Sequence, residues 1–283
     1  MEVKNIFYSY KKNDDYAVND VSFDIAKGEI FGFLGPSGAG KSTTQGILSG
    51  LLELQKGDLI IDGKPRQGQP DKAFFNRIGV GFEIPNVYKK LSGLDNLKFH
   101  AKLYDGETED PMKVLEMVGL AEESKKKAGA YSKGMKQRLG FARSMINKPD
   151  IWFLDEPTLG LDPTTANSIK RIIQKKQKEG TTIFLTTHNM FVADELCNRV
   201  AFIVDGKIAA IDTPKNLKLK YGQLTVTVEY AENGKLKSET LGMTDKDKEV
   251  LQKFIAEHDV KTIHSGEPTL EEIFIKLTGR GLE

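Results

Sequence analysis

The nine residues Gly-Pro-Ser-Gly-Ala-Gly-Lys-Ser-Thr at positions 35–43 constrain the fold of this chain more than any other segment. A continuously apolar run, Ile30 to Leu34, precedes them and is typical of a strand buried on both faces. A helix is predicted after them, from about Lys41 to Ser49. This order of strand, glycine-rich loop and helix is the context that a phosphate-binding P-loop requires, and it argues against a glycine-rich turn that matches by chance. We therefore expect an α/β protein built around a nucleotide site.

The P-loop residues suit the binding of ATP and Mg²⁺. Glycines allow successive backbone N–H groups to point at phosphate oxygens, and the start of the following helix adds a partial positive charge. The Lys41 ammonium is expected to contact the β and γ phosphates, and the Ser42 hydroxyl is placed to ligate Mg²⁺. The predicted nucleotide-binding residues here are Gly35, Pro36, Ser37, Gly38, Ala39, Gly40, Lys41, Ser42 and Thr43. The pattern alone does not say which class of NTPase this is.

A pair of acidic residues follows another apolar run. Ile151 to Leu154 lead directly into Asp155 and Glu156. An acidic residue at the end of a buried strand, beside a P-loop, is typical of a Mg-nucleotide site. Asp155 is expected to hold the metal through water, because Mg²⁺ keeps part of its hydration shell. Glu156 is then placed to orient and deprotonate the attacking water. A lone Asp-Glu is more often a surface pair, but the apolar run before it disfavours that interpretation.

The first part of the chain predicts a P-loop NTPase core with two additions. Alternating segments, Val3 to Tyr10 and Val18 to Ile25, indicate an N-terminal antiparallel β subdomain. Helical patterns indicate an all-helical insertion at about 88–147, with Ser92 as an N-cap and Pro111 in a first helical turn. The α/β pattern then resumes and ends in a predicted hairpin at 200–211.

A third addition is a small α+β appendage at the C-terminal end, residues 216–283. Residues 224–230 alternate between polar and apolar, and Asn233-Gly234 offers a hairpin turn. Thr244 is a predicted helix cap, and Thr269 with Glu272 has the spacing of a capping box.

Three further motifs follow one another within residues 1 to about 215. Tyr131 to Arg138 reads Tyr-Ser-Lys-Gly-Met-Lys-Gln-Arg and resembles the signature sequence of the ABC ATPases, usually LSGGQxQR. Leu159 to Asp162 resembles their D-loop, and His188 resembles their switch histidine. Tyr10 lies where the family stacks an aromatic ring on adenine, and nearby Tyr16 is a rival. Because all motifs appear in family order, residues 1–215 are expected to be an ABC-type ATPase domain.

The resemblance implies a composite site made by two chains. A helix is predicted from Gly134 to Ile146, so Ser132 and the Gly134 backbone lie at its positive end, which suits an anion. In the family this end binds the γ-phosphate of ATP held by the opposite subunit, and we count Asp162 of the D-loop among the nucleotide-binding residues. Since each motif occurs once, a second ATPase subunit is implied, as a homodimer or a paired homologue. Glu156 and His188 are the implied catalytic residues.

Several positions depart from the family pattern. Tyr131, Lys133 and Met135 replace the usual Leu, Gly and Gln, which is most similar to drug and polysaccharide exporters. Glu83 stands where the family has its Q-loop glutamine, and a similar glutamate occurs in ATPases of bacitracin and lantibiotic export or immunity. A plain surface carboxylate is the alternative for Glu83. The predicted metal ligands are Ser42, Glu83 and Asp155.

Composition limits the partners. The 283 residues carry 41 Lys+Arg and 40 Asp+Glu, a formal net charge of +1, so the basic excess typical of nucleic-acid binders is absent and no nucleic acid is expected. No apolar run approaches the ~20 residues needed to span a bilayer. A membrane role therefore implies a separate transmembrane permease. We expect a cytoplasmic chain, held peripherally on the inner face of the cell membrane by that permease.

The expected function is the ATP-hydrolysing subunit of an ABC transporter, with export favoured by the resemblance. One alternative is a non-transport ABC ATPase acting on nucleic acid or ribosomes, but those usually carry two cassettes in one chain or a long coiled coil. Another is a metabolic kinase of the P-loop class, which would lack the signature and the D-loop.

Overall fold

The computed structural model describes residues 1–11, 15–66, 68, 70–232 and 235–281, and these form two compact units. The first unit spans Met1–Ile211, and the second begins at Asp212. The sequence places the division at 215/216, which falls inside α8 (Pro214–Tyr221). That helix packs against α10 (Leu270–Thr278) and so belongs with the second unit. Across the described residues, no helix has the length and apolar character that crossing a membrane requires.

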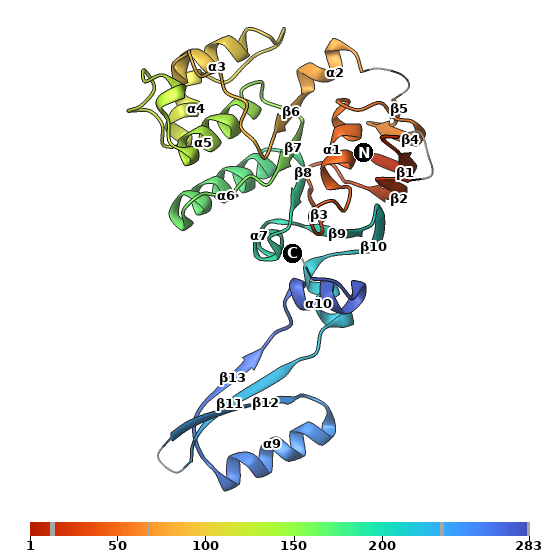
Figure 1. Ribbon diagram of the computed structural model, residues 1–283, viewed down its shortest axis with the longest axis vertical. Helices are drawn as coiled ribbons and strands as arrows, with labels where there is room; N and C mark the ends of the chain where they lie inside the picture. Colours follow the sequence, from red (N-terminus) through yellow and green to blue (C-terminus); the bar gives the residue numbers. More distant parts are fainter. Residues whose placement is uncertain (12–14, 67, 69, 233–234, 282–283) are drawn as a thin grey trace. The chain divides into compact units, whose positions relative to one another are not determined.

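A six-stranded sheet forms the centre of the first unit (Figure 1). Its order is β10-β9-β3-β8-β7-β6, and the five strands from β9 to β6 run parallel. The strands are β3 (Ile30–Leu34), β6 (Ile78–Gly81), β7 (Ile151–Asp155), β8 (Thr182–Thr187), β9 (Arg199–Val204) and β10 (Lys207–Asp212). As their apolar runs predict, β3 and β7 are buried along their whole length, and β8 is buried as well. Because parallel strands end at one edge, the loops after β3, β6, β7 and β8 meet there.

A second sheet packs against the first through phenylalanine rings. It has the order β2-β1-β4-β5, formed by β1 (Glu2–Tyr8), β2 (Val18–Asp24), β4 (Lys56–Ile61) and β5 (Lys64–Pro65), and all of its pairs are antiparallel. Phe23 of β2 stacks on Phe31 of β3 with centroids 5.1 Å apart, and it also lies 5.5 Å from the ring of Phe33. The predicted antiparallel β subdomain is confirmed. However, β1 ends at Tyr8, where its pairing with β2 stops, so Tyr10 lies in the loop beyond.

The helices of the first unit surround the parallel sheet, and α3, α4 and α5 gather on one side of it (Figure 1). They are α1 (Lys41–Ser49), α2 (Lys72–Arg77), α3 (Gly93–Ala101), α4 (Pro111–Met117), a short 3₁₀ turn (Ala128–Ala130), α5 (Lys133–Ser144), α6 (Pro163–Lys178) and α7 (Met190–Leu196). The Ser92 hydroxyl accepts from the backbone N–H of Asp95 over 3.0 Å, which confirms this N-cap. Pro111 begins α4 as predicted.

Helix α5 packs closely against the segment that follows β6. Gly140 leaves no room for a side chain, because a Cβ there would lie 2.8 Å from Cβ of Pro85. Three residues later, the Arg143 guanidinium donates to the Asn86 carbonyl. These contacts hold Pro85 and Asn86, two and three residues after Glu83, against α5.

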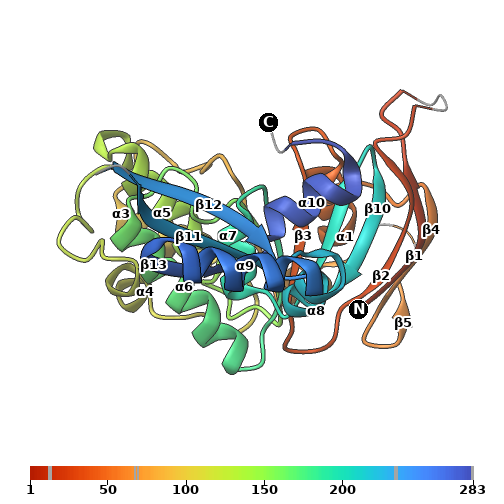
Figure 2. The same ribbon diagram turned by 90° about the horizontal axis from the view of Figure 1, so that it is seen from below.

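The second unit contains a three-stranded antiparallel sheet with one helix along it (Figures 1 and 2). The sheet order is β12-β11-β13, from β11 (Thr225–Glu232), β12 (Lys235–Gly242) and β13 (Asp259–Gly266), and the helix is α9 (Asp245–Glu257). The Tyr230 ring of β11 meets Phe254 of α9 edge-on at 4.8 Å. The cap at Thr244 and the capping box of Thr269 with Glu272 are present, as predicted, and Thr244 also forms a capping box with Asp247. The predicted turn at Asn233-Gly234 lies outside the described residues.

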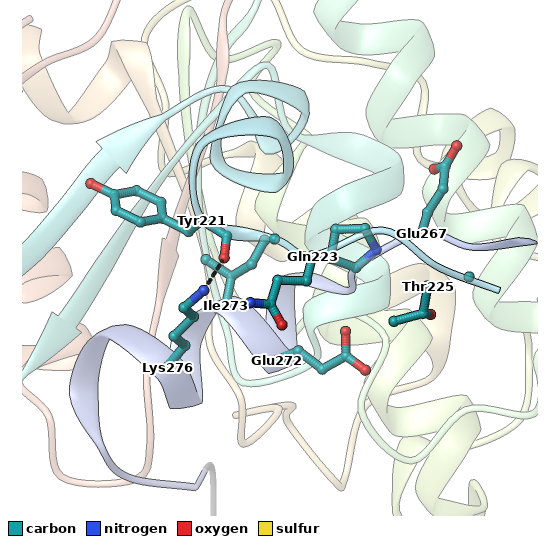
Figure 3. A pocket seen from close by; sticks show the side chains of 10 residues that line it. Tyr221, Gln223, Thr225, Glu267, Glu272, Ile273 and Lys276 are labelled. Carbon is teal, nitrogen blue, oxygen red and sulfur yellow. Dashed lines mark hydrogen bonds between the residues drawn. The ribbon is translucent and has the colours of Figure 1, made fainter. Parts of the chain in front are cut away.

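A polar hollow of about 330 Å³ lies where α8 runs into β11 and β13 runs into α10 (Figure 3). The Lys276 ammonium of α10 donates to the Tyr221 carbonyl at the end of α8 over 2.9 Å, so it ties the two helices together. The Glu272 carboxylate, at the rim of this hollow, accepts from the backbone N–H of Thr269 and so caps α10.

Candidate active site

The loop between β3 and α1 wraps around the Lys41 ammonium. Lys41 Nζ donates to the carbonyls of Gly35 and Pro36 over 2.7 and 2.9 Å. Helix α1 starts after Gly40, which has a left-handed φ of 104°, and a Cβ there would lie 2.4 Å from the Ala17 carbonyl oxygen. Both the backbone conformation and the close approach therefore demand glycine at this position.

Three carboxylates act on the Lys41 ammonium. Burial lowers the pKa of Lys41 from its ordinary value, and the charges of Glu156, Asp155 and Glu83 oppose that shift. Glu83 follows β6, which pairs with β7, so it leaves the sheet at the edge where Asp155 ends its strand. Glu83 is exposed, so its role in the site stays a prediction beside the surface-carboxylate alternative.

Asp155 is held on both of its oxygens. Oδ2 accepts from the Ser42 hydroxyl over 3.1 Å, and Oδ1 accepts from the Thr186 hydroxyl over 2.5 Å. Burial raises the pKa of Asp155, while the hydrogen bonds from Thr186 and Ser42 lower it. A hydroxyl and a carboxylate oxygen side by side are hard donors of the kind that Mg²⁺ takes, with phosphate oxygens and water completing its shell. Ser42 and Asp155 therefore fit a magnesium ion.

Glu156 follows Asp155 and forms a bonded cluster with the end of β8. Its Oε1 accepts from the His188 backbone N–H over 2.8 Å and lies 2.6 Å from Nδ1 of the His188 ring. Its Oε2 accepts from the Thr187 hydroxyl over 2.8 Å. The Glu156 carboxylate is buried, whereas the His188 side chain is 47% exposed. The sequence-predicted catalytic pair is thus in direct contact.

The backbone at Glu156 is strained, with a left-handed φ of 48° for a side chain that rarely adopts it. Its backbone N–H donates to the Thr186 carbonyl over 2.9 Å, which holds this conformation. Such strain costs of order 1–3 kcal/mol and is typical of functional positions. Here the strained backbone turns the chain sharply after β7, so that Asp155 and Glu156 contact different side chains.

An open hollow of about 600 Å³ lies beside the P-loop. Tyr10, Tyr16 and Gly38 all line it. The Tyr10 hydroxyl lies 3.1 Å from Oγ1 of Thr43, and the ring is 65% exposed. The Tyr16 ring packs edge-on against Phe7 at 5.5 Å. Both tyrosines therefore border the space next to the phosphate loop, and Tyr10 is the one bonded to α1.

Comparison with known proteins decides the family. A family model described as "ABC transporter" matches residues 18–159, about half of the chain. A fluoroquinolones export ATP-binding protein of Mycobacterium tuberculosis is 49% identical over 285 residues, covering 100% of this chain and 94% of that protein. The chain belongs to the ABC transporter ATP-binding family. As a member, it is an ATP-binding ATPase with a P-loop NTPase fold.

Other ABC relatives extend the comparison. The linearmycin resistance ATP-binding protein of Bacillus subtilis is 33% identical, covering 100% of this chain and 99% of that protein. The bacitracin transport ATP-binding protein of Bacillus licheniformis is 33% identical, covering 94% of this chain and 93% of that protein. Among solved structures, a dimeric ATP-binding cassette in a post-hydrolysis state bound to ADP and Pi matches with a TM-score of 0.67 and 27% identity, covering 75% of this chain and 97% of that one.

The ABC signature and D-loop residues lie at helix starts in this chain. The Ser132 hydroxyl caps α5 by accepting from the Met135 N–H over 3.2 Å, and Asp162 caps α6 by accepting from the Thr165 N–H over 3.0 Å. Hydrogen bonds from the Thr165 side chain and from its backbone N–H lower the pKa of the Asp162 carboxyl. Leu161 lies beside Gly134, so the signature and the D-loop touch. Among the described residues, no hydrogen bond joins Ser132, Gly134 or Asp162 to the P-loop of the same chain.

Sequence reasoning missed the side chains that hold the two acids. Thr186 and Thr187 occupy the end of β8, and parallel pairing sets Thr186 opposite Asp155. Gln45 of α1 is 3% exposed, and its side-chain amide contacts the Thr186 hydroxyl. The sequence does place these two polar residues directly after the apolar run 183–185, at the same edge of the sheet as Asp155 and Glu156.

Proposed function

We propose that this chain is the ATP-hydrolysing subunit of an exporter and drives a separate transmembrane permease through ATP-dependent pairing of two ATPase subunits. The carrying observation is the meeting of Lys41, Asp155 and the Glu156–His188 pair at one edge of the parallel sheet. Export is supported by relatives named for fluoroquinolone export, linearmycin resistance and bacitracin transport. We assign the ATPase domain to the predicted residues 1–215, except that α8 (Pro214–Tyr221) goes with the extension in residues 216–283.

In this proposal ATP is held by the P-loop and Mg²⁺ by neighbouring oxygens. Lys41 and the loop N–H groups neutralise phosphate charge, and the Tyr10 ring covers the adenine. Ser42 and Asp155 hold the metal, with Glu83 as a further anionic ligand. Bound Mg²⁺ supplies charge stabilisation at the phosphate oxygens.

The Glu156 carboxylate is the general base for the attacking water. His188 holds that carboxylate through Nδ1 and supplies a contact that develops in the transition state. Both groups come from the loops after β7 and β8, so they lie at the edge of the sheet where the P-loop follows β3.

The second subunit completes the site. Ser132, Gly134 and Asp162 are exposed or half-buried at helix N-termini and bond locally, so they are free to face a nucleotide held by another chain. The partner is a second copy or a paired homologue. The dimeric cassette bound to ADP and Pi supports this arrangement by similarity.

An apolar surface in the helical insertion supports the permease partner. Tyr88 and Phe99 are 48% and 43% exposed and meet edge-on at 5.1 Å. Ile84, one residue after Glu83, is 71% exposed on the segment held by α5. Exposed apolar patches of this kind mark protein interaction sites. A permease segment bound here would contact the chain next to its metal-binding carboxylate, which couples transport to hydrolysis.

The test is cell fractionation with and without the permease. We expect the chain to sediment with membranes when its permease is present and to enter the soluble fraction when the permease is deleted. The protein that co-purifies from detergent extract identifies the permease. A chain that stays on membranes without the permease would instead bind lipid directly, and the peripheral assignment would be wrong.

A further inference from the structure

The Thr186 hydroxyl faces three oxygen atoms although it carries one proton. Thr186 is completely buried, and its Oγ1 lies 2.5 Å from Oδ1 of Asp155, 3.3 Å from the Leu154 carbonyl oxygen and 3.3 Å from Oε1 of Gln45. An ionised carboxylate only accepts hydrogen bonds. The contact with Asp155 is the shortest of the three, and charge-assisted bonds are the strongest. The proton of Thr186 therefore goes to Asp155.

The Gln45 amide needs a different partner from the one its oxygen meets. Its side chain is 3% exposed, and buried amides are almost always hydrogen-bonded because an unpaired one is costly. Because the Thr186 hydroxyl donates its proton to Asp155, no hydrogen remains to join Oγ1 of Thr186 to Oε1 of Gln45. A half-turn about the last side-chain bond exchanges Oε1 and Nε2 of the amide. Nε2 then donates to a lone pair on Thr186.

Gln45 stands three residues after Ser42 on α1, which puts both on one face of that helix. Ser42 donates to Oδ2 of Asp155, whereas Gln45 reaches Oδ1 through Thr186. The helix that follows the P-loop therefore contacts both oxygens of the carboxylate, one directly and one through a neighbour.

We propose that Gln45 and Thr186 form a relay of hydrogen bonds that positions the Asp155 carboxylate for the metal. Gln45 Nε2 donates to Thr186, and Thr186 donates to Oδ1, so that Oδ2 stays turned toward Ser42. Both are positioning residues, since they are buried and act on Asp155 and neither is among the residues assigned to the nucleotide. The inference rests on the proposed use of Mg²⁺.

The test measures how much the metal contributes to nucleotide binding. The affinity of the full chain for a slowly hydrolysed fluorescent ATP analogue is measured in EDTA and again in saturating Mg²⁺. Thr186→Val should lower the affinity in Mg²⁺ divided by the affinity in EDTA by about tenfold, the scale seen when groups behind a metal ligand are removed. The affinity in EDTA should not change. Thr186→Ser should restore the ratio, and Gln45→Met should lower it by a smaller factor.

The matched control is Thr182→Val. Thr182 is buried at the other end of β8, where its hydroxyl accepts from the Gly28 backbone N–H, so this variant makes the same change away from the acids. Its ratio should equal that of the parent chain. The relay is overturned if Thr186→Val and Gln45→Met both keep the parent ratio, or if they weaken binding equally with and without metal. A parent chain without any metal dependence overturns the proposed Mg²⁺ site itself.

Discussion

The Nδ1 atom of His188 lies 2.6 Å from Oε1 of Glu156, and the backbone N–H of the same histidine donates to that oxygen over 2.8 Å. The Thr187 hydroxyl holds the other oxygen. The acid directly after β7 is thus fixed by the last residue of β8 and the residue that follows it, and the pairing of these strands sets the geometry of the proposed base.

Replacing Glu156 separates binding from hydrolysis. Glu156→Gln removes the carboxylate but keeps the shape and one accepting oxygen, so ATP should bind without being consumed and should hold two chains together. Size-exclusion chromatography in saturating MgATP measures the pairing. In the same background, Ser132→Arg should abolish the dimer and leave nucleotide binding to the P-loop intact. A Glu156→Gln chain that stays monomeric in saturating MgATP would contradict the hypothesis that two chains form one nucleotide site.

Replacing His188 should slow turnover without preventing nucleotide binding. His188→Ala removes the ring that contacts Glu156 and a donor for the transition state, and the loss of such a contact commonly costs on the order of a hundredfold in rate. Steady-state ATPase rates and ATP affinity, measured on the same preparation, check this. A variant with parental turnover would mean that the Glu156–His188 contact only shapes the loop.

The local features of the site could be predicted, because they depend on residues close together in the sequence. The P-loop needs only β3, the loop and α1 in order, and Asp155 is recognised by the apolar run before it. The contacts of Thr186 and Thr187 depend on the pairing of β7 with β8, across 31 positions of sequence. Strand β13 gave no clear alternating pattern, because its residues are exposed on both faces and it is held by its ladder with β11.

Glu83 provides a third prediction, because its charge, with those of Glu156 and Asp155, opposes the lowering of the Lys41 pKa by burial. A glutamine there keeps a neutral carbonyl oxygen for the metal but loses the full charge that favours a hard cation. Glu83→Gln should therefore keep hydrolysis but raise the Mg²⁺ concentration for half-maximal activity by roughly tenfold, the scale of one charge-assisted contact. Glu83→Ala should weaken metal use and also uncouple hydrolysis from transport. ATPase activity against Mg²⁺, with the permease present, distinguishes the forms, and coincident curves would place Glu83 outside the site.

His100 makes the stability of the first unit depend on pH. Burial lowers the pKa of His100 to about 4 from 6.5, and the charge of Arg143 acts in the same direction. Its Nε2 lies 3.2 Å from the Tyr104 hydroxyl in the helical insertion. Between these pKa values the unfolded chain binds a proton that the folded chain does not. The contribution of neutral His100 is therefore present above pH 6.5 and is lost as the pH falls toward 4, by at most about 3 kcal/mol.

Urea unfolding followed by fluorescence checks this, because the single tryptophan, Trp152, is buried in β7 and reports on the first unit. His100→Gln keeps a polar side chain but does not titrate, so its free energy of unfolding should fall less than that of the parent between pH 7.5 and pH 4.5, by about 2 kcal/mol. His264→Gln, which removes an exposed histidine from the second unit, should follow the parent at both pH values. Equal losses in the parent and His100→Gln would show that the acid sensitivity of this unit arises from other groups, with the carboxylates at the strand ends the next to be substituted.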